Sequence, residues 1–248
     1  MKRPPRFAVI GIKPAAASVR IVGSELHHLR DVMRLTADSE VALIDDSGAE
    51  YLGLVESIGP SHAEVRLLQA REPDARSGCR IVLAIATIKG PRMDFIVEKA
   101  AELGAAELWP IECARGLVHT IGNARIARWR RLATAAAKQS LSPRATQISE
   151  PIEFGDLLAK AGDHALRLIC RIGHPPLAPI VRSARSDSIL IACGPEGDFT
   201  PEEVAAANDA GFVSAGLGNR RLRSETAAMA ALSVAANAVA ESNGESKT

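Results

Sequence analysis

The apolar run at residues 80–88 (RIVLAIATI) constrains the fold of this chain more than any other segment. It has no alternating polar face, which is typical of a strand covered on both sides. We expect further strands at residues 107–111, 165–170, 188–193 and 212–217, and helices at residues 94–103 and 124–140 and from Pro201 and Ser224. Strands that alternate with helices predict an α/β fold with a parallel sheet between helical layers.

The first 74 residues follow a different pattern. Short alternating runs separated by turn residues occur at residues 6–12, 40–44, 51–58 and 63–68. They predict a small antiparallel sheet or barrel. One short helix is expected in it, with Ser24 as its N-cap and with an apolar set, Leu26, Leu29, Val32 and Met33, that belongs to the core. The polar segment 71–78 is the expected linker, so we predict two domains, residues 1–74 and 75–248.

Charge is balanced over the chain but segregated along it. With 30 Lys and Arg against 29 Asp and Glu, the net charge is +1, so affinity for a polyanion has to come from a local patch. Residues 1–34 carry +5, residues 35–75 carry −7, and residues 115–144 contain seven Lys or Arg and no acid. The last stretch is either a polyanion-binding surface or a solvated helix face.

Cysteine usage and hydropathy exclude several classes of protein. The four cysteines are far apart in sequence and form no CxxC pair, so we expect neither a disulfide framework nor a zinc site. For the same reason we expect no bound metal. We also expect no membrane partner, because no apolar run approaches the length of a membrane span. A cytoplasmic location is the resulting expectation.

Two loops at the ends of expected strands carry the strongest functional signal. The first, Gly194-Pro195-Glu196-Gly197, leads into a helix for which Thr200, Pro201 and Glu203 provide a capping box. Ligands of open α/β sheets bind just beyond the carboxyl ends of strands. The second, residues 216–226, begins like a dinucleotide fingerprint but has Arg221 where the third glycine is needed, which disfavours a Rossmann dehydrogenase. Each loop alone can also be read as an ordinary turn, and Arg223 and Glu225 as a simple ion pair.

Taken together, GPEGDFTPEE (194–203) and LGNRRLRSETAAMAAL (217–232) resemble the 16S rRNA (uracil-N3)-methyltransferase family of the SPOUT superfamily. The segments KGPRMDFIVEKAAELG (89–104) and HHLRDVMRL (27–35) extend the likeness over nearly the whole chain. The chain departs from the family pattern at Asp198, usually glycine, and at Arg221, usually apolar. It also departs at Lys138-Gln139-Ser140-Leu141, where an acidic residue and a glycine are more typical.

The resemblance implies a trefoil-knotted α/β domain preceded by a PUA-like β-barrel that docks RNA. It implies a homodimer that binds S-adenosylmethionine and methylates N3 of a uridine in 16S rRNA of the small ribosomal subunit. The residues that it places around the cofactor are Leu168, Ile169, Cys170, Gly194, Pro195, Glu196, Gly197, Leu217, Gly218, Leu222, Arg223 and Thr226.

The roles of single residues follow from this likeness and from chemistry. We expect Arg223 to stabilise the uracil as N3 loses its proton, and Glu196 or Glu225 to orient the base or accept the proton. The expected RNA-binding residues are Arg6, Arg20, His28, Arg30, Arg34, Lys89 and Arg92, with Arg30 and Arg34 on one helix face. A methyltransferase with another RNA target and a non-catalytic ribosome-assembly factor remain alternatives.

Overall fold

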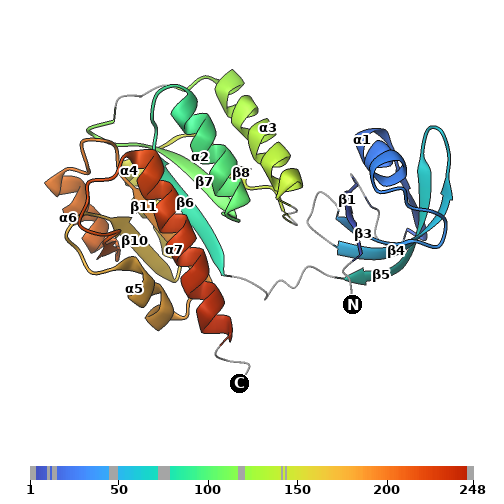
Figure 1. The fold of residues 1–248 in the computed structure, drawn as a ribbon. Coiled ribbons are helices and arrows are strands. Elements are labelled where there is room, and N and C mark those ends of the chain that lie inside the picture. The colour runs from blue at the N-terminus through green and yellow to red at the C-terminus, as the bar shows by residue number, and fades with distance from the viewer. Residues whose placement is uncertain are drawn as a thin grey trace. The chain divides into compact units, whose positions relative to one another are not determined.

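The computed structural model describes residues 4–9, 12, 16–44, 50–71, 79–116, 121–140, 142 and 144–244 (Figure 1). The chain divides into two compact units, Met1–Ser77 and Gly78–Thr248. The predicted boundary between residues 74 and 75 lies outside the described residues, as does Leu141 of the divergent segment 138–141.

The first unit is built on a five-stranded sheet. Its strands are β1 (Arg6–Ala8), β2 (Ser18–Ile21), β3 (Glu40–Ile44), β4 (Glu50–Ile58) and β5 (Ala63–Arg71), in the order β1-β3-β4-β5-β2. The expected strands at 40–44, 51–58 and 63–68 are confirmed, whereas β2 was not anticipated. The pairing also differs in one place, because β1 runs parallel to β3 while the other strands pair antiparallel.

The expected helix of this unit is present, but its details differ. It consists of α1 (Gly23–His27) followed by the π-helical turn η1 (His28–Val32). Val22 occupies the N-cap position without a side-chain hydrogen bond, so Ser24 is not the cap. The helix ends at Val32, and Arg34 adopts a left-handed conformation with φ of 52°. Arg30 and Arg34 therefore do not share a helix face.

The apolar set of this helix is only partly in the core. Leu26 and Leu29 are buried, whereas Val32 and Met33 are 57% and 44% exposed. A π-turn has more residues per turn than an α-helix. Val32 and Met33, three and four residues beyond Leu29, are therefore rotated away from the core. An α-helix would have directed both of them toward it.

The second unit contains the predicted parallel sheet. Its strands are β6 (Arg80–Ala86), β7 (Glu107–Glu112), β8 (Gln147–Ile148), β9 (Ile152–Glu153), β10 (Leu166–Cys170), β11 (Ser188–Cys193) and β12 (Val213–Ala215). The order is β12-β10-β11-β6-β7-β8, with β9 also pairing with β7, and the pairings are parallel. The continuous apolar run at residues 80–88 thus forms part of the interior of the sheet, as expected.

Helices cover both faces of this sheet (Figure 1). α2 (Pro91–Glu102), α3 (Asn123–Gln139), α5 (Leu177–Ala184) and α7 (Ser224–Gly244) share one apolar cluster with alternate strand residues such as Leu83. α4 (Phe154–Lys160), followed by the short 3₁₀ turn η2 (Ala161–Asp163), and α6 (Pro201–Asp209) share the opposite cluster with residues such as Val82. The doubly covered sheet is confirmed, and α4 and α5 were not anticipated.

The loop that follows β12 crosses the two loops that follow β10 and β11. Gly216 accepts a hydrogen bond from the Leu177 amide (3.1 Å) and donates one to the Pro175 carbonyl (2.7 Å). Further along, the Ser224 hydroxyl donates to the Gly194 carbonyl (3.1 Å) at the start of α7. Helix α7 then packs against β6, β11, α2 and α5. This return of the chain past two earlier loops is the path that the expected knot requires.

Substitution of Gly216 tests the crossing. A Cβ atom at this position would overlap the backbone carbonyl of His174, and backbone cannot move aside as a flexible side chain can. We expect Gly216→Ala to lower the free energy of unfolding by about 1–3 kcal/mol, measured by urea denaturation. Gly155→Ala is the matched control, since a Cβ there meets nothing within 4 Å. Equal stability of the two variants would contradict the close approach.

Candidate functional site

A cavity of about 300 Å³ lies where β10 and β11 end, at the carboxyl edge of the parallel sheet. The three crossing loops form its wall. Its lining residues are Cys170, Arg171, Ile172, Cys193, Gly194, Pro195, Glu196, Asp198, Leu217, Gly218, Arg220, Arg221, Leu222, Ser224 and Ala227. The edge beyond the carboxyl ends of strands is where ligands bind in open α/β sheets.

The cavity brings together many of the residues that the sequence analysis assigned to the cofactor. Those among its lining are Cys170, Gly194, Pro195, Glu196, Leu217, Gly218 and Leu222. Leu168 and Ile169 are instead fully buried in the two apolar clusters on either face of the sheet. Gly197, Arg223 and Thr226 are not part of the lining. They belong to the same two loops and the first turn of α7.

Local hydrogen bonds fix the shape of the loop at residues 194–200. Thr200 and Glu203 form the predicted capping box at the start of α6, and the second carboxylate oxygen of Glu203 accepts a hydrogen bond from the Ala114 amide (2.8 Å). The Arg115 guanidinium donates to the Gly197 carbonyl (2.9 Å). Asp198, at φ of 61°, accepts a hydrogen bond from the Phe199 amide through its own carboxylate (2.8 Å). Aspartate tolerates this left-handed conformation, so the loop keeps its turn without the usual glycine.

Two carboxylates next to the cavity share one arginine. Arg92, in the first turn of α2, donates to the Glu196 carboxylate, and its Nη1 lies 3.8 Å from Oε2 of Glu225. The hydrogen bond from Arg92 is the main cause of the lowered pKa of Glu196. Oε2 of Glu225 is buried and has no hydrogen-bond partner among the described residues. The structure therefore places Arg92, which we had assigned to RNA, beside Glu196 and Glu225.

Arg223 is exposed and is not among the ion-paired residues of the described chain. Its charge contributes to the lowered pKa of Glu196, after the larger effect of Arg92. The neighbouring Arg221 donates to the Glu196 carbonyl (2.8 Å) and so ties the two loops together. The simple Arg223–Glu225 ion pair considered from the sequence is thus replaced by an interaction between Glu225 and Arg92.

Several lining residues were missed by the sequence analysis. Arg171 directly follows β10, and its Nε is buried without a hydrogen-bond partner among the described residues. The sequence could have pointed to Arg171, since this residue directly follows the segment 168–170 that was already assigned to the cofactor. Cys193 and Ser224 were equally close to the assigned loops.

The Cys193 thiol in the cavity wall is not activated. A hydrogen bond with Cys170, together with burial, raises the pKa of the Cys193 thiol. A thiol with a raised pKa remains protonated at neutral pH and is a poor nucleophile. Within the described part of the chain, no group of three or more His, Cys, Asp or Glu residues is arranged to hold a metal ion.

The basic residues of the first unit differ in whether they already interact with other residues of the chain. Arg20 pairs with Glu64 at 3.1 Å, and His28 packs its ring edge-on against Phe7, with 5.9 Å between ring centroids. Arg34 is exposed and forms none of the ion pairs or side-chain hydrogen bonds found among the described residues. Arg6 has an interaction within the chain.

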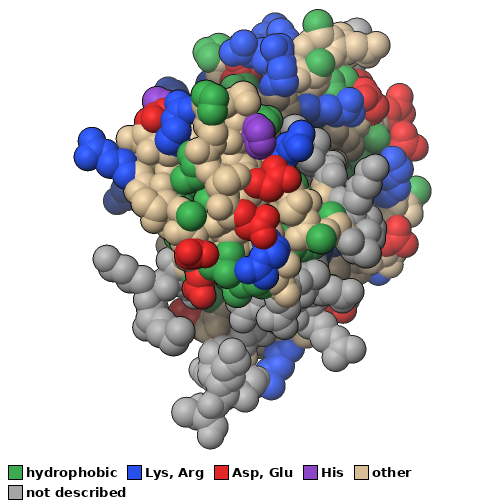
Figure 2. Space-filling model, turned by 90° about the vertical axis from the view of Figure 1, so that its right-hand side faces the viewer, with side chains coloured by type: hydrophobic (Ala, Val, Ile, Leu, Met, Phe, Trp, Pro, Cys, Tyr) green, Lys and Arg blue, Asp and Glu red, His purple; other side chains and the backbone are tan. Residues whose placement is uncertain are grey.

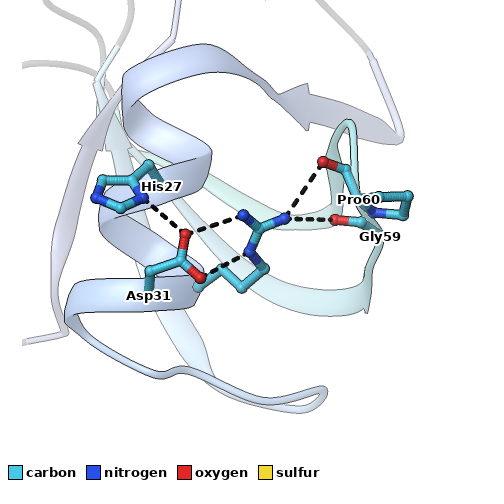
Figure 3. A network of polar contacts seen from close by, with 5 residues as sticks. His27, Asp31, Gly59 and Pro60 are labelled. Atoms are coloured by element: carbon cyan, nitrogen blue, oxygen red, sulfur yellow. Dashed lines mark hydrogen bonds and ion pairs between the residues drawn. The ribbon is translucent and has the colours of Figure 1, made fainter.

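Arg30 is the most strongly engaged of these residues (Figure 3). Its Nε and Nη2 each donate to the Asp31 carboxylate at 2.9 Å, and its Nη1 donates to the carbonyls of Gly59 and Pro60. His27 contacts the same carboxylate at 2.7 Å. Arg30 thereby fastens the π-turn to the connection between β4 and β5. The hydrogen bond from Arg30 is the main cause of the lowered pKa of Asp31, about 2.

Basic side chains are also partly neutralised elsewhere. On α3, Arg128 pairs with Asp94 at 3.0 Å and Arg130 with Glu150 at 2.8 Å. The other basic residues of this helix, Arg125, Arg131 and Lys138, are exposed without ion pairs among the described residues. Figure 2 shows acidic and basic side chains interspersed near the middle of one face of the molecule.

In the described part of the chain, no helix combines the length and the apolar character that a membrane crossing needs.

Comparison with protein families matches both units. Residues 75–236 match the RNA methyltransferase domain, and residues 22–68 match the RNA methyltransferase PUA domain. Among characterised sequences, the chain is 31% identical to ribosomal RNA small subunit methyltransferase E of Synechocystis, with 87% of this chain and 72% of the relative aligned. It is 28% identical to the protein of the same name from Bacillus subtilis, over 88% of this chain and 89% of the relative.

Solved structures give the same picture. A ribosomal RNA small subunit methyltransferase E from Neisseria gonorrhoeae bound to S-adenosylmethionine superimposes with a TM-score of 0.73 at 28% identity, covering 93% of this chain and 95% of the other. A methyltransferase from Legionella pneumophila in complex with the same cofactor gives a TM-score of 0.70 at 26% identity, covering 96% and 98%. The expected fold class, an α/β-knot domain preceded by a PUA-like domain, is thereby confirmed.

The Arg30 network predicts a pH effect. Because the pKa of Asp31 is lowered in the folded state, the ion pair stabilises the fold above the carboxyl's unfolded pKa, and this contribution is lost as the pH falls through about 2. We expect Arg30→Met to raise the pKa of Asp31 toward its ordinary value of 3.8, observed by NMR titration of the side-chain carboxyl. Arg34→Met is the control and should leave the titration unchanged. An unaltered titration in Arg30→Met would contradict the network.

Proposed function

The chain belongs to the ribosomal RNA small subunit methyltransferase E family, and on that premise we propose that it transfers the methyl group of S-adenosylmethionine to N3 of a uridine in 16S rRNA. The main support is the cavity at the carboxyl ends of β10 and β11, whose wall contains both loops of the family resemblance. Relatives of similar length carry this name, and two similar structures hold the cofactor.

The residues at the cavity suit this cofactor. A Cβ atom at Gly194 would lie 3.0–3.4 Å from the Phe199 ring, which is a tight contact, and Gly218 has φ of 107°, a conformation that favours glycine. Ile172, Leu217 and Leu222 offer apolar contacts, and Nε of Arg171 is buried without a hydrogen-bond partner among the described residues. When bound, S-adenosylmethionine supplies an activated methyl group.

What remains for the protein is to make uracil N3 nucleophilic. We assign proton removal to Glu225 and orientation of the base to Glu196. The Arg92 hydrogen bond that lowers the pKa of Glu196 keeps it ionised and makes it a weaker base, whereas Glu225 has a buried oxygen without a hydrogen-bond partner among the described residues. Arg223 would stabilise negative charge on the uracil oxygens, because it is exposed and close enough to Glu196 for its charge to affect that carboxylate.

The first unit, predicted as residues 1–74, would dock the rRNA. Arg34 is the strongest candidate for a phosphate contact, since Arg20 and Arg30 are already paired with Glu64 and Asp31. Lys89, exposed just before α2, would add a contact near the cavity. His28 and Arg6 are further candidates, and Arg92 is reassigned to the carboxylates. A homodimer in the cytoplasm without a bound metal completes the proposal, on the strength of the family resemblance.

Methyl transfer by an Arg223 variant tests the reaction. We expect the wild-type protein with S-adenosylmethionine to produce 3-methyluridine in unmodified small ribosomal subunits, detected by mass spectrometry of nucleosides. At saturating cofactor, Arg223→Ala should lower kcat by about 100-fold or more, the usual effect of losing one donor to a developing negative charge. Arg182→Ala serves as control, because this exposed residue pairs with Glu241 at 2.8 Å.

Other outcomes of this experiment have definite meanings. Near wild-type turnover of Arg223→Ala would reject the role of Arg223. Methylation of a different atom or a different RNA would retain the enzyme and reject the target. Cofactor binding without methylation of any small-subunit preparation would favour the assembly-factor alternative.

RNA binding by Arg34 has its own test. Fluorescence anisotropy with a labelled 16S rRNA fragment is measured at several salt concentrations. Loss of one phosphate contact in Arg34→Ala should weaken binding and make the slope of log K against log salt shallower by about 0.7–0.9. Arg20→Ala should change the slope less, because Arg20 is already paired with Glu64. Identical slopes for wild type and Arg34→Ala would show that Arg34 does not contact phosphate.

A further inference from the structure

Arg171 presents an unusual feature in the wall of the cavity. Its Nε is buried and has no hydrogen-bond partner among the described residues. A buried polar nitrogen without a partner is costly, and native structures contain few of them. The backbone amide of Arg171 donates to the Ala215 carbonyl at 2.8 Å, which fixes the root of the side chain between the ends of β10 and β12. The backbone of Arg171 is therefore held in place, while its Nε has no acceptor among the described residues.

The acidic residues in the same wall are already engaged. Glu196 accepts hydrogen bonds from Arg92, and Asp198 accepts one from the Phe199 amide. Among the described residues, neither of them lies within ion-pair distance of Arg171. Among the described residues, Arg171 thus forms no ion pair, and it lines the cavity.

We propose that Arg171 binds the carboxylate of the amino-acid portion of S-adenosylmethionine, an inference that rests on the proposed function. This carboxylate is the one anionic group of the cofactor. A guanidinium is planar and offers parallel N–H groups that match a carboxylate in a bidentate arrangement. An RNA phosphate would be served better by Arg220 and Arg221, which are exposed in the cavity wall. Arg171 would therefore position the cofactor from the end of β10.

Calorimetric titration with two ligands tests this assignment. S-adenosylhomocysteine carries the carboxylate, whereas 5′-methylthioadenosine shares the nucleoside and the thioether but lacks the amino-acid portion. We expect Arg171→Ala to weaken S-adenosylhomocysteine about tenfold or more, the range for a lost hydrogen bond to a charged group. Binding of 5′-methylthioadenosine should change less than about twofold. Arg171→Lys should lie between wild type and Arg171→Ala.

Two further comparisons isolate the role of the guanidinium. Arg220→Ala removes the same charge from an exposed position of the cavity, so an equal loss of S-adenosylhomocysteine binding would attribute the effect to general electrostatics and overturn the proposal. In turnover assays, Arg171→Ala should raise KM for S-adenosylmethionine with little change in kcat. This pattern is expected for a contact that stabilises the bound cofactor equally in the ground state and in the transition state. Circular dichroism of each variant confirms that it is folded.

The remaining outcomes separate this inference from the proposed function. Equal weakening of both ligands in folded Arg171→Ala would indicate a structural role and overturn the assignment. Unchanged binding of S-adenosylhomocysteine together with weaker rRNA binding would assign Arg171 to a phosphate and overturn it as well. Failure of the wild-type protein to bind S-adenosylhomocysteine would instead reject the proposed function, and the inference with it.

Discussion

The site depends on the close packing of three loops at the carboxyl edge of the parallel sheet. Gly216 exchanges backbone hydrogen bonds with Pro175 and Leu177, and Ser224 bonds to Gly194, so the last loop can neither withdraw nor widen without breaking them. Since α7 begins at Ser224 and packs on β6 and β11, the stability of the whole α/β unit holds the cavity wall in place. Binding and folding are therefore coupled through the same crossing.

A second organising principle is local compensation of charge. Runs of basic residues in the sequence face acids from distant segments in the fold, as in Arg128 with Asp94 and Arg130 with Glu150. Arg30 donates hydrogen bonds to Asp31 and to two backbone carbonyls. It therefore stabilises the π-turn and is not free to bind another anion. Arg34, exposed in the first unit, and Arg171, at the cavity, differ in burial and accordingly in the anions that they suit.

The sequence predicted the parallel sheet well because continuous apolar runs such as residues 80–88 are typical of strands that are covered on both faces. The capping box at Thr200 was also predicted correctly, since it depends on neighbours within a few residues. The prediction failed at Val32 and Met33, where a single π-turn shifts the helical register. No periodicity argument that assumes an α-helix can detect such a turn. β2, which spans only four residues, was missed.

The sequence by itself determined the two-part organisation, the alternation of strands and helices, and the two glycine-containing loops, because each is encoded by local patterns of hydrophobicity and turn residues. The tertiary structure alone decided which side chains meet. It joined Arg92 to Glu196, which are 104 positions apart, and placed the buried Nε of Arg171 in the cavity wall. The physical reason is that ion pairs and unsatisfied hydrogen bonds depend on distances between atoms in the folded chain. Spacing along the sequence does not determine these distances.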